Sequence, residues 1–409
     1  EHTRCGPVAG PVLARGAYAN RRAAWLDKPV NESAPVSVTR QRPLPAMLIA
    51  AVVSLAVGYV VLELVNAGIR LVWETIPGTW TQTPAWYVIG VLLIAAVLVY
   101  LVRRFVADSG HSPIGGIKVS GLTPKEYLGA ILAIFASLWG GVVLGPEVAL
   151  VATGSVIGGI AAKSMRITES KVVTKVVGVG ALGGILALFV EPFMSGSMKL
   201  GSAPTAIEVD QLGWAVLVAL IATLAVTIAR LFAALIARAS QAGPHLPILV
   251  GAALIIAAAA LLMQAWTGQA VIYITTSGED LITDLPTLTS APTVAAIIAL
   301  KTIAYAVSLG AGFRGGPFFP AMFVGAASGL LIALVIDGGP SVPAAIVVGV
   351  IAAVIATAPM KWPIAISLGV VLGFLMGTWT LVPAAIVGAM VARAIPRLGD
   401  RISIPAHNG

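Results

Sequence analysis

The sequence predicts an all-α, multi-pass membrane protein built from two inverted-topology repeats of tilted and broken helices. Three observations lead to this fold class: the composition, the spacing of charge-free runs and an internal repeat. Of the 409 residues, 58% are hydrophobic and only 10% are charged, and the mean hydropathy is +0.97. A soluble domain carries about a quarter charged residues. This chain could not keep its surface hydrated, so we expect the lipid bilayer to surround it.

The chain divides into four expected regions. Residues 1–45 hold seven Lys or Arg residues against three acids, with many Pro and Ala residues, and show no secretory signal pattern. They are expected to form a basic cytosolic tail, disordered or partly helical. Residues 46–240 are predicted to form the first membrane repeat and 241–395 the second. Residues 396–409 then form a short C-terminal tail.

Charge-free runs predict the membrane spans in order. The first run covers 46–62, and the second covers 85–102 and ends at Arg103 and Arg104. The loop between them, "ETIPGTWTQTP", has no Lys or Arg. Because Lys and Arg gather in cytoplasmic loops, we expect a cell-membrane protein with a cytoplasmic N-terminus. The later runs are 127–146, 148–162, 176–190, 212–229, 246–278, 302–313, 315–336, 338–360 and 362–392.

Several of these runs do not fit one full span, which needs about 20 apolar residues. The runs 148–162 and 176–190 have 15 residues each, and 302–313 has 12. Other runs are too long and contain Pro or Gly. Short and interrupted segments are typical of helices that break near the middle of the membrane. Non-helical backbone is tolerated in the middle of the membrane only where it lines a cavity or is buried in protein.

An internal repeat accompanies these breaks. When the chain is shifted by 171 residues, positions 131–158 show eight identities in 28 gap-free positions, where composition predicts about three. Two halves with matched breaks predict a transporter-like fold with its site between them. The glycines that follow each break are expected to be close-packing positions. The matched residues include Gly141 with Gly312, Gly145 with Gly316, Pro146 with Pro317, Gly154 with Gly325 and Gly158 with Gly329.

Three segments combine a helix break with free backbone donors. They are "DSGHSPIGG" at 108–116, "GGVVLGPEVAL" at 140–150 and "GAGFRGGPFFPAMFVGAASG" at 310–329. Each places Gly or Pro where a helix should begin. A helix N-terminus leaves N–H groups unbonded and carries about half a positive charge. Several such ends directed at one point make an anion site without a full positive charge, and the anion can leave quickly.

These segments resemble the signature stretches of the CLC chloride channel and transporter family, which are GSGIP, G(K/R)EGP and GxFxP. "GGPFFPAMFVGAASG" matches the third, "GVVLGP" the second, and "SGHSP" the first loosely. The resemblance covers about 46–395 and indicates a divergent, bacterial-type member. It implies conduction of chloride or a similar halide, a voltage-gated homodimer and no cofactor. The implied anion-binding or pore residues are Ser109, Gly110, His111, Ser112, Pro113, Gly141, Leu144, Gly145, Pro146, Glu147, Gly316, Pro317, Phe318, Phe319 and Pro320.

The chain departs from the family pattern at the gate. The family's Glu before Gly-Pro in the second motif is the outer gate and proton acceptor, and here that position is Leu144. Leucine can neither compete with an anion nor carry a proton. The family's inner proton-transfer Glu falls near Ser202. The serine that contacts the central anion becomes Gly110, flanked by Ser109 and Ser112. We therefore expect passive anion conduction, or a gate built differently.

The third motif departs as well. The two family amides that bind the anion fall at Pro317 and Phe318. Pro317 has no N–H, so Phe318 and Phe319 are left as the amide donors. The family's late pore tyrosine has no clear counterpart, and Ser403 is the nearest candidate.

Four charged or titratable residues have alternative interpretations. Glu147 is a helix-start acid that favours its own dipole, a displaced gate or proton acceptor, or a partner of another polar group. Glu191 is a helix-end acid that pairs with Lys199 or lies near the lipid headgroups, or it is a transport residue. His111 is a satisfied loop residue, or an anion contact that makes transport pH-sensitive below about pH 6.5. Arg314 is a surface charge or part of an electrostatic funnel.

Three functions stay open. They are an anion channel, a proton-coupled anion antiporter that uses Glu147 or another acid, and a non-conducting structural or sensing membrane protein. No enzyme is expected, because no nucleophile–base pair, metal cluster or phosphate loop has the required spacing. The single Cys5 excludes an intrachain disulfide and a Cys-based metal site. The net charge of +8 reports topology rather than nucleic-acid binding.

Overall fold

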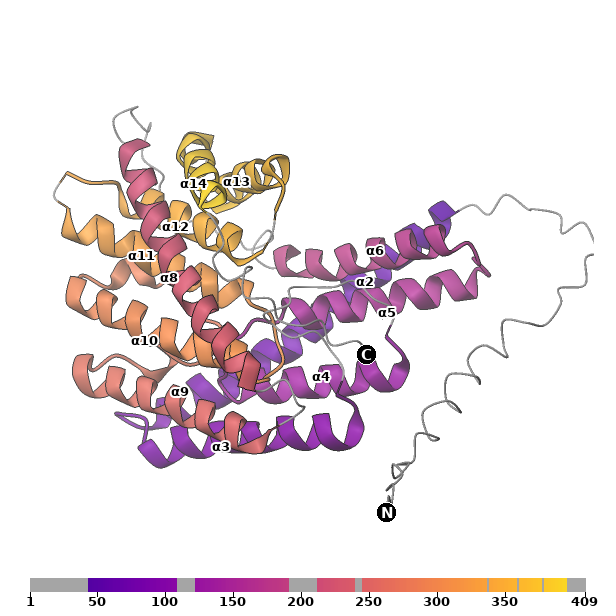
Figure 1. Ribbon diagram of the computed structural model, residues 1–409, viewed down its shortest axis with the longest axis horizontal. Helices are drawn as coiled ribbons and strands as arrows, with labels where there is room; N and C mark the ends of the chain where they lie inside the picture. The colour runs from indigo at the N-terminus through magenta and orange to yellow at the C-terminus, as the bar shows by residue number, and fades with distance from the viewer. Residues whose placement is uncertain are drawn as a thin grey trace, which may run out of the picture. The chain divides into compact units, whose positions relative to one another are not determined.

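The computed structural model describes residues 43–108, 122–190, 212–239, 245–336, 338–358, 360–376 and 379–395. These residues are almost entirely helical, as predicted (Figure 1). The α-helices are α2 (Pro43–Arg70), α3 (Ala85–Leu101), α4 (Pro124–Trp139), α5 (Glu147–Ser164), α6 (Ser170–Leu186), α8 (Leu212–Ala239), α9 (Leu246–Thr267), α10 (Ala291–Gly310), α11 (Phe318–Val335), α12 (Val342–Thr357), α13 (Trp362–Met376) and α14 (Val382–Ala394). Short π or 3-10 segments are η1 (Leu71–Thr75), η2 (Pro77–Thr79), η3 (Val102–Val106), η5 (Ala187–Phe189), η7 (Val271–Tyr273), η8 (Leu285–Thr287) and η9 (Trp379–Leu381).

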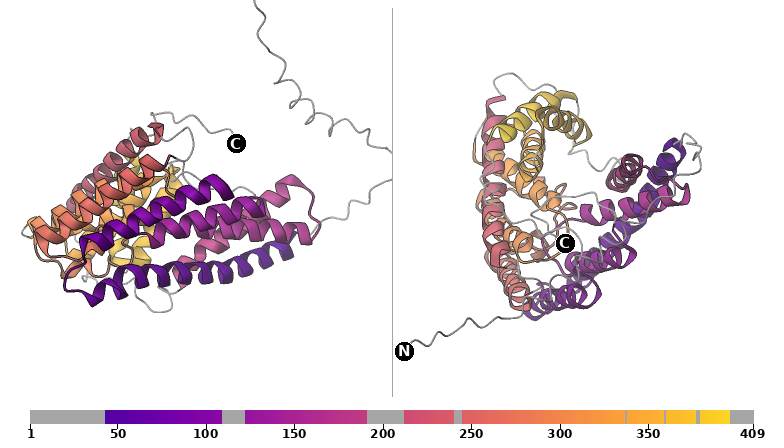
Figure 2. Two further views of the ribbon diagram at one scale, coloured as in Figure 1. Left: turned by 90° about the horizontal axis from the view of Figure 1, so that it is seen from below. Right: turned by 45° about the vertical axis from the view of Figure 1, so that its right-hand side comes forward.

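The helices from α2 onward pack as two groups, which are joined through α3, α4 and α9 and at the two helix breaks. The α2, α5 and α6 helices pack against one another, and α8 packs against α10, α11, α12 and α14. Figure 2 shows both groups from two further directions. The α3 helix packs on α9 and α4, so it joins the groups. The site predicted between the two halves therefore has helices of both groups around it.

Eight of the described helical segments are long and apolar enough to cross a membrane. Their outward-facing residues are largely apolar: Leu48, Leu224 and Phe232 each expose more than half of their surface. Such faces suit contact with lipid rather than water. With 28 residues, α2 is about 42 Å long at 1.5 Å per residue, which exceeds a hydrocarbon core of about 30 Å. Excess length of this kind is accommodated by tilting.

The prediction of a short span from one charge-free run was wrong. Residues 302–310 of the run 302–313 belong to α10, which begins at Ala291 and continues through Lys301. Lys301 is fully buried, and its Nζ donates hydrogen bonds to the carbonyl oxygens of Thr275 (2.9 Å) and Thr276 (3.0 Å). A buried lysine with its own acceptors ended the charge-free run without ending the helix.

The repeat with a shift of 171 residues is present in the helices. The bounds of α5 and α11 differ by 171 at both ends, and so do the last residues of α4 and α10 and of α6 and α12. The α2 and α8 helices have 28 residues each and begin 169 residues apart. The predicted division of the membrane part at residue 240 stays a prediction, and the match of α2 with α8 favours a boundary before α8.

The glycines after each break serve close packing, as predicted. A Cβ atom on Gly154 or Gly158 would collide with backbone atoms of α6, and one on Gly325 or Gly329 would collide with backbone atoms of α12. Small residues let membrane helices approach until their backbones touch. These contacts hold α5 and α11 in place, and with them the two breaks.

The two helix breaks are bonded directly to each other. The N–H of Gly145 donates to the carbonyl oxygen of Gly316 (2.8 Å), and the N–H of Gly316 donates to that of Gly145 (2.7 Å). A second reciprocal pair lies beside it. The N–H of Val143 donates to Ser308 Oγ, and the N–H of Arg314 donates to Ser137 Oγ. Each of these two hydrogen bonds is 3.1 Å long. Gly145 and Gly316 are themselves related by the shift of 171, and the shift turns the bond of Val143 with Ser308 into the bond of Arg314 with Ser137. The breaks therefore meet about a local two-fold axis.

Candidate functional site

The N-termini of α5 and α11 meet at this junction. The α5 helix begins after Pro146 and α11 after Pro317, and neither proline gives its helix a side-chain cap. The first N–H groups of a helix have no partner within it. Because Gly145 and Gly316 bridge the two chain segments, both sets of amides and both positive dipole ends lie close together. This is the arrangement that the sequence predicted for an anion site.

Glu147 places a carboxylate on the amides of the opposite helix. Its Oε1 accepts a hydrogen bond of 2.6 Å from the backbone N–H of Phe318. Glu147 is 2% exposed. Backbone N–H groups at a helix N-terminus suit anions, and here one of them holds a carboxylate that belongs to the protein itself.

Two glycines make room for this carboxylate. A Cβ atom on Gly316 would collide with Cγ, Cδ and Oε1 of Glu147. A Cβ atom on Gly145 would collide with Oε2 of Glu147 and with the ring of Phe319. The bare backbone of both breaks therefore forms the walls of the carboxylate site. The Gly-Pro pairs do more than stop the preceding helices, because they also leave space for the acid.

The structure bears on two of the three interpretations of Glu147, the helix-start acid and the partner of another polar group. Glu147 is the first residue of α5, as the helix-start interpretation requires. Its side-chain hydrogen bond of 2.6 Å, however, joins it to Phe318 of α11. The interpretation as a partner of another polar group is confirmed, since that group is the Phe318 amide. A role as a displaced gate stays a proposal.

The other residues of the second motif are buried around the junction. Leu144 is fully buried, and its side chain packs over Gly315. It does not line the cavity described below. Gly141 has φ +79°, a backbone conformation that favours glycine, and it lies under the ring of Trp73.

The third motif keeps one amide donor at the place predicted. Pro317 has no N–H, and its carbonyl oxygen accepts a hydrogen bond of 2.6 Å from the Tyr305 hydroxyl. The Phe318 N–H donates to Glu147 Oε1, and its expected contact with an anion stays a prediction. Phe319 lines the cavity, and Pro320 is buried in the first turn of α11.

The first motif lies outside the described residues. This applies to the predicted site residues Ser109, Gly110, His111, Ser112 and Pro113. It also applies to Glu191, Lys199, Ser202 and Ser403.

A cavity of about 540 Å³ opens beside Glu147. Its walls come from α2, α5, α6, α11, α12 and α13 and are mostly apolar. Four polar residues stand out among them: Asn66, Glu147, Glu279 and Asp280. Sequence reasoning missed Asn66, Glu279 and Asp280 as site residues. The useful indication was the acid pair in "TTSGEDL", which lies between apolar spans without any Lys or Arg beside it.

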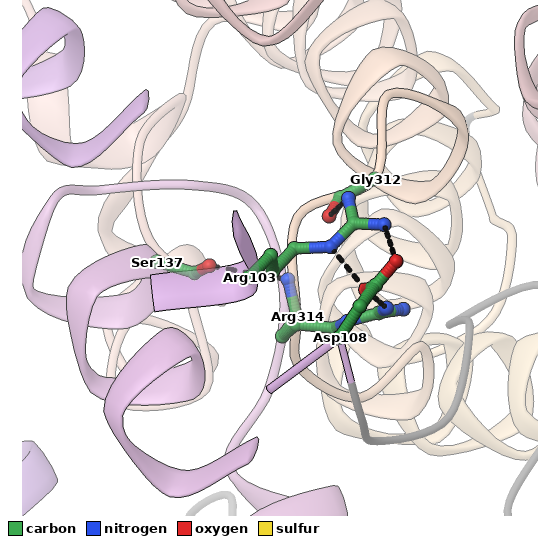
Figure 3. A network of polar contacts seen from close by, with 5 residues as sticks. All are labelled: Arg103, Asp108, Ser137, Gly312 and Arg314. Carbon is green, nitrogen blue, oxygen red and sulfur yellow. Dashed lines mark hydrogen bonds and ion pairs between the residues drawn. The ribbon is translucent and has the colours of Figure 1, made fainter. Parts of the chain in front are cut away.

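A second charged group ties α3 to the break before α11 (Figure 3). Arg103 donates two hydrogen bonds to the Asp108 carboxylate, from Nε (2.7 Å) and from Nη2 (3.2 Å). Its Nη1 donates a third, of 2.8 Å, to the carbonyl oxygen of Gly312. Arg314 Nη2 donates to the same carboxylate over 2.7 Å. Arg314 is 8% exposed, so its interpretation as a surface charge is wrong. Two guanidinium groups and one carboxylate leave this group with a net positive charge.

Asp108→Asn is expected to lower the melting temperature in detergent by a few degrees at pH 7. Burial alone raises the pKa of the Asp108 carboxyl, but the hydrogen bonds and charges of Arg103 and Arg314 outweigh it and lower that pKa. The stabilisation is therefore complete above the unfolded pKa of about 3.9 and is lost as the pH falls through the lower folded value. The melting difference between variant and wild type should shrink below about pH 4. A difference that is constant with pH would contradict the ion pair as its cause.

The second half of the chain matches a known protein family. The sequence model of the family described as "Voltage gated chloride channel" matches residues 172–397, which is more than half of the chain. The chain belongs to this family. The match includes the GxFxP-like segment at 315–320 and begins after Glu147. The resemblance predicted from the motifs is thus confirmed, and so is the fold class.

Curated relatives of this voltage-gated chloride channel family member match over a shorter part. "Putative ion-transport protein YfeO" of Escherichia coli (strain SE11) is 37% identical over 114 residues, covering 25% of this chain and 26% of the relative. The protein of the same name from Escherichia coli (strain K12 / DH10B) is 36% identical over 114 residues. The chain spans about a quarter of the length of these relatives.

Solved structures confirm the fold over most of the chain. A slow cyanobacterial Cl−/H+ antiporter superposes with a TM-score of 0.67 at 16% identity, over 86% of this chain and 93% of the other. A CLC-type fluoride/proton antiporter gives 0.61 at 14% identity, over 90% and 97%. A eukaryotic CLC transporter gives 0.60 at 14% identity, over 88% and 72%. At these identities the likeness establishes the CLC architecture.

Proposed function

We propose that this chain transports a small inorganic anion, chloride or a similar halide, across the membrane between the N-termini of α5 and α11. Membership in the voltage-gated chloride channel family supports anion transport. The observation that carries the proposal is the hydrogen bond from the Phe318 N–H to Glu147 Oε1. It places an ionisable group on an amide that suits an anion.

The same bond favours coupling to protons. An ionised carboxylate and a halide compete for one set of amides, because both are anions that accept N–H bonds. A protonated Glu147 binds those amides more weakly and leaves them to the halide. Anion entry then requires a proton, which is the basis of exchange. Two of the similar solved structures are proton antiporters for chloride and fluoride, and this supports the proposal.

Passive conduction is the second candidate. Leu144 stands at the family's gate position and is fully buried, and Ser202 stands near the family's inner acid. Neither carries a proton. On this alternative, Glu147 holds α11 in place and the anion passes beside it. A homodimer in the cell membrane, voltage gating and a cytoplasmic N-terminus remain proposals that rest on the family and on the charge distribution.

Reconstitution into chloride-loaded liposomes separates these functions. Valinomycin sets the potential, and electrodes follow chloride efflux and external pH together. Proton-coupled exchange predicts proton uptake in fixed proportion to chloride efflux, even against a proton gradient. Chloride efflux without proton uptake would establish passive conduction. Fluoride, bromide and nitrate are tested in parallel, and absence of flux for every anion would contradict transport and favour a structural or sensing protein.

A further inference from the structure

The cavity beside Glu147 holds oxygen atoms that lack partners. Within the described residues, Glu147 Oε2, Glu279 Oε2 and Asn66 Oδ1 are buried and accept no hydrogen bond. All three residues line the same cavity. Buried polar oxygens are nearly always hydrogen-bonded, and an unmet acceptor is costly. A volume of about 540 Å³ is far larger than the 10–15 Å³ that one water needs. These atoms therefore face a space in which water or a carboxylic proton can satisfy them.

Glu279 is held in place by a buried framework. The two residues at the start of its turn, Thr275 and Thr276, bind Lys301 Nζ through their carbonyl oxygens. The N–H of Thr276 also donates to the carbonyl oxygen of Gly141, just before α5 (3.0 Å). Gly278, with φ +82°, lies against the ring of Phe323 in α11, where a side chain would not fit. The turn is thus fixed to the break before α5 and to α10 and α11.

Exposure decreases along the acids of this cavity. Asp280 is exposed, Glu279 is partly buried, and Glu147 is 2% exposed. The order leads from solvent at the rim to the carboxylate on the Phe318 amide. Acids in such an order are suited to passing protons inward, because all three line one cavity that water can fill.

We propose that Glu279 is the proton-relay residue that loads and unloads Glu147 through this cavity. The inference rests on the proposed function of Glu147 as an ionisable gate. In one step, the O–H bond of protonated Glu279 breaks and an O–H bond forms on the Glu147 carboxylate, directly or through cavity water. Glu279 is left as a carboxylate and takes a new proton from water at the rim near Asp280. The reverse sequence returns the proton when the anion has left.

The charges around Glu279 suit this role. Burial, the neighbouring Asp280 and Glu147 all raise the pKa of Glu279 well above its ordinary value. Lys301 of α10 lies behind the turn, with its Nζ bonded to the two threonine carbonyls rather than to an acid. A carboxyl whose pKa is raised toward neutral values exchanges a proton with a neighbour more readily than one at its ordinary pKa.

The test uses three proteins in liposomes: wild type, Glu147→Gln and Glu279→Gln. In Glu279→Gln, we expect chloride efflux to stay within about three-fold of wild type while proton uptake per chloride falls at least about ten-fold. Asp284→Asn is the matched control, because Asp284 is an exposed acid of the same loop that does not line the cavity. It should transport like wild type. If Glu279→Gln does not fold, Glu279→Asp should restore folding and keep a reduced proton uptake.

Infrared difference spectra between acid and neutral pH supply a second readout. We expect a carboxylic-acid band that disappears in Glu279→Gln and titrates at lower pH in Glu147→Gln, because the neighbouring negative charge is then gone. The relay is overturned if Glu279→Gln keeps wild-type coupling while Glu147→Gln loses it, or if the band does not move in Glu147→Gln. Wild-type efflux without protons would instead contradict the proposed gate, and the relay with it.

Discussion

Glu147→Gln is expected to abolish proton-coupled transport and to leave an anion flux that no longer depends on pH. Glutamine has the shape of glutamic acid but neither releases nor binds a proton between pH 5 and pH 8. Its carbonyl oxygen can still accept the Phe318 N–H, though more weakly. Hydrogen bonds to charged groups contribute about 1.5–3 kcal/mol and neutral ones about 0.5–1.5. A difference of ~1 kcal/mol makes the amide about five-fold more available to a halide.

The measurement is chloride efflux and proton uptake between pH 5 and pH 8. Wild-type efflux should rise as the pH falls, because protonation releases the amide, and the Glu147→Gln efflux should stay flat near the acid-limit rate. Glu74→Gln is the matched control, since Glu74 is an exposed acid in η1, away from the cavity. Retention of wild-type coupling by Glu147→Gln would show that the carboxylate only fastens α5 to α11.

The sequence was sufficient to predict the breaks but not the contact between them. Glu147 and Phe318 are related by the same shift of 171 that relates Gly145 to Gly316. Both residues were singled out as site positions, yet a repeat does not show that equivalent positions face each other. That follows only from the local two-fold arrangement, which depends on the packing of α5 and α11 against their neighbours.

Long-range polar contacts explain the other differences. Lys301 looked like the end of a span, because its two carbonyl partners lie 25 and 26 residues earlier in a turn without regular pattern. A surface position for Arg314 stayed open as one of two interpretations, because its partner Asp108 is 206 residues away. Glu279 was overlooked for the same reason, because it comes to line the same cavity as Glu147 only when the chain folds. Apolar periodicity and breaks are local features, whereas the partners of buried charges are not.

Gly316→Ala is expected to expel the Glu147 carboxylate from the Phe318 amide. The three nearest atoms to a Cβ on Gly316 all belong to the Glu147 side chain. That side chain is flexible, so it moves rather than the backbone. The variant loses a charge-assisted hydrogen bond, which costs about 1.5–3 kcal/mol. The gate is then empty at neutral pH, and chloride efflux should lose its pH dependence while proton coupling falls.

A double-mutant cycle tests this cause, with thermal unfolding in detergent as the measurement. Glu147→Ala removes the atoms that collide with the new methyl group, so Gly316→Ala should cost little in that background. The coupling between the two changes should be about 1.5–3 kcal/mol. Gly325→Ala is the matched control, because its Cβ would meet the backbone of Gly349 and the side chain of Ala353 instead. Its cost should be the same with or without Glu147. Additive effects of Gly316→Ala and Glu147→Ala would mean that the glycine serves the backbone bridge to Gly145 and not the carboxylate.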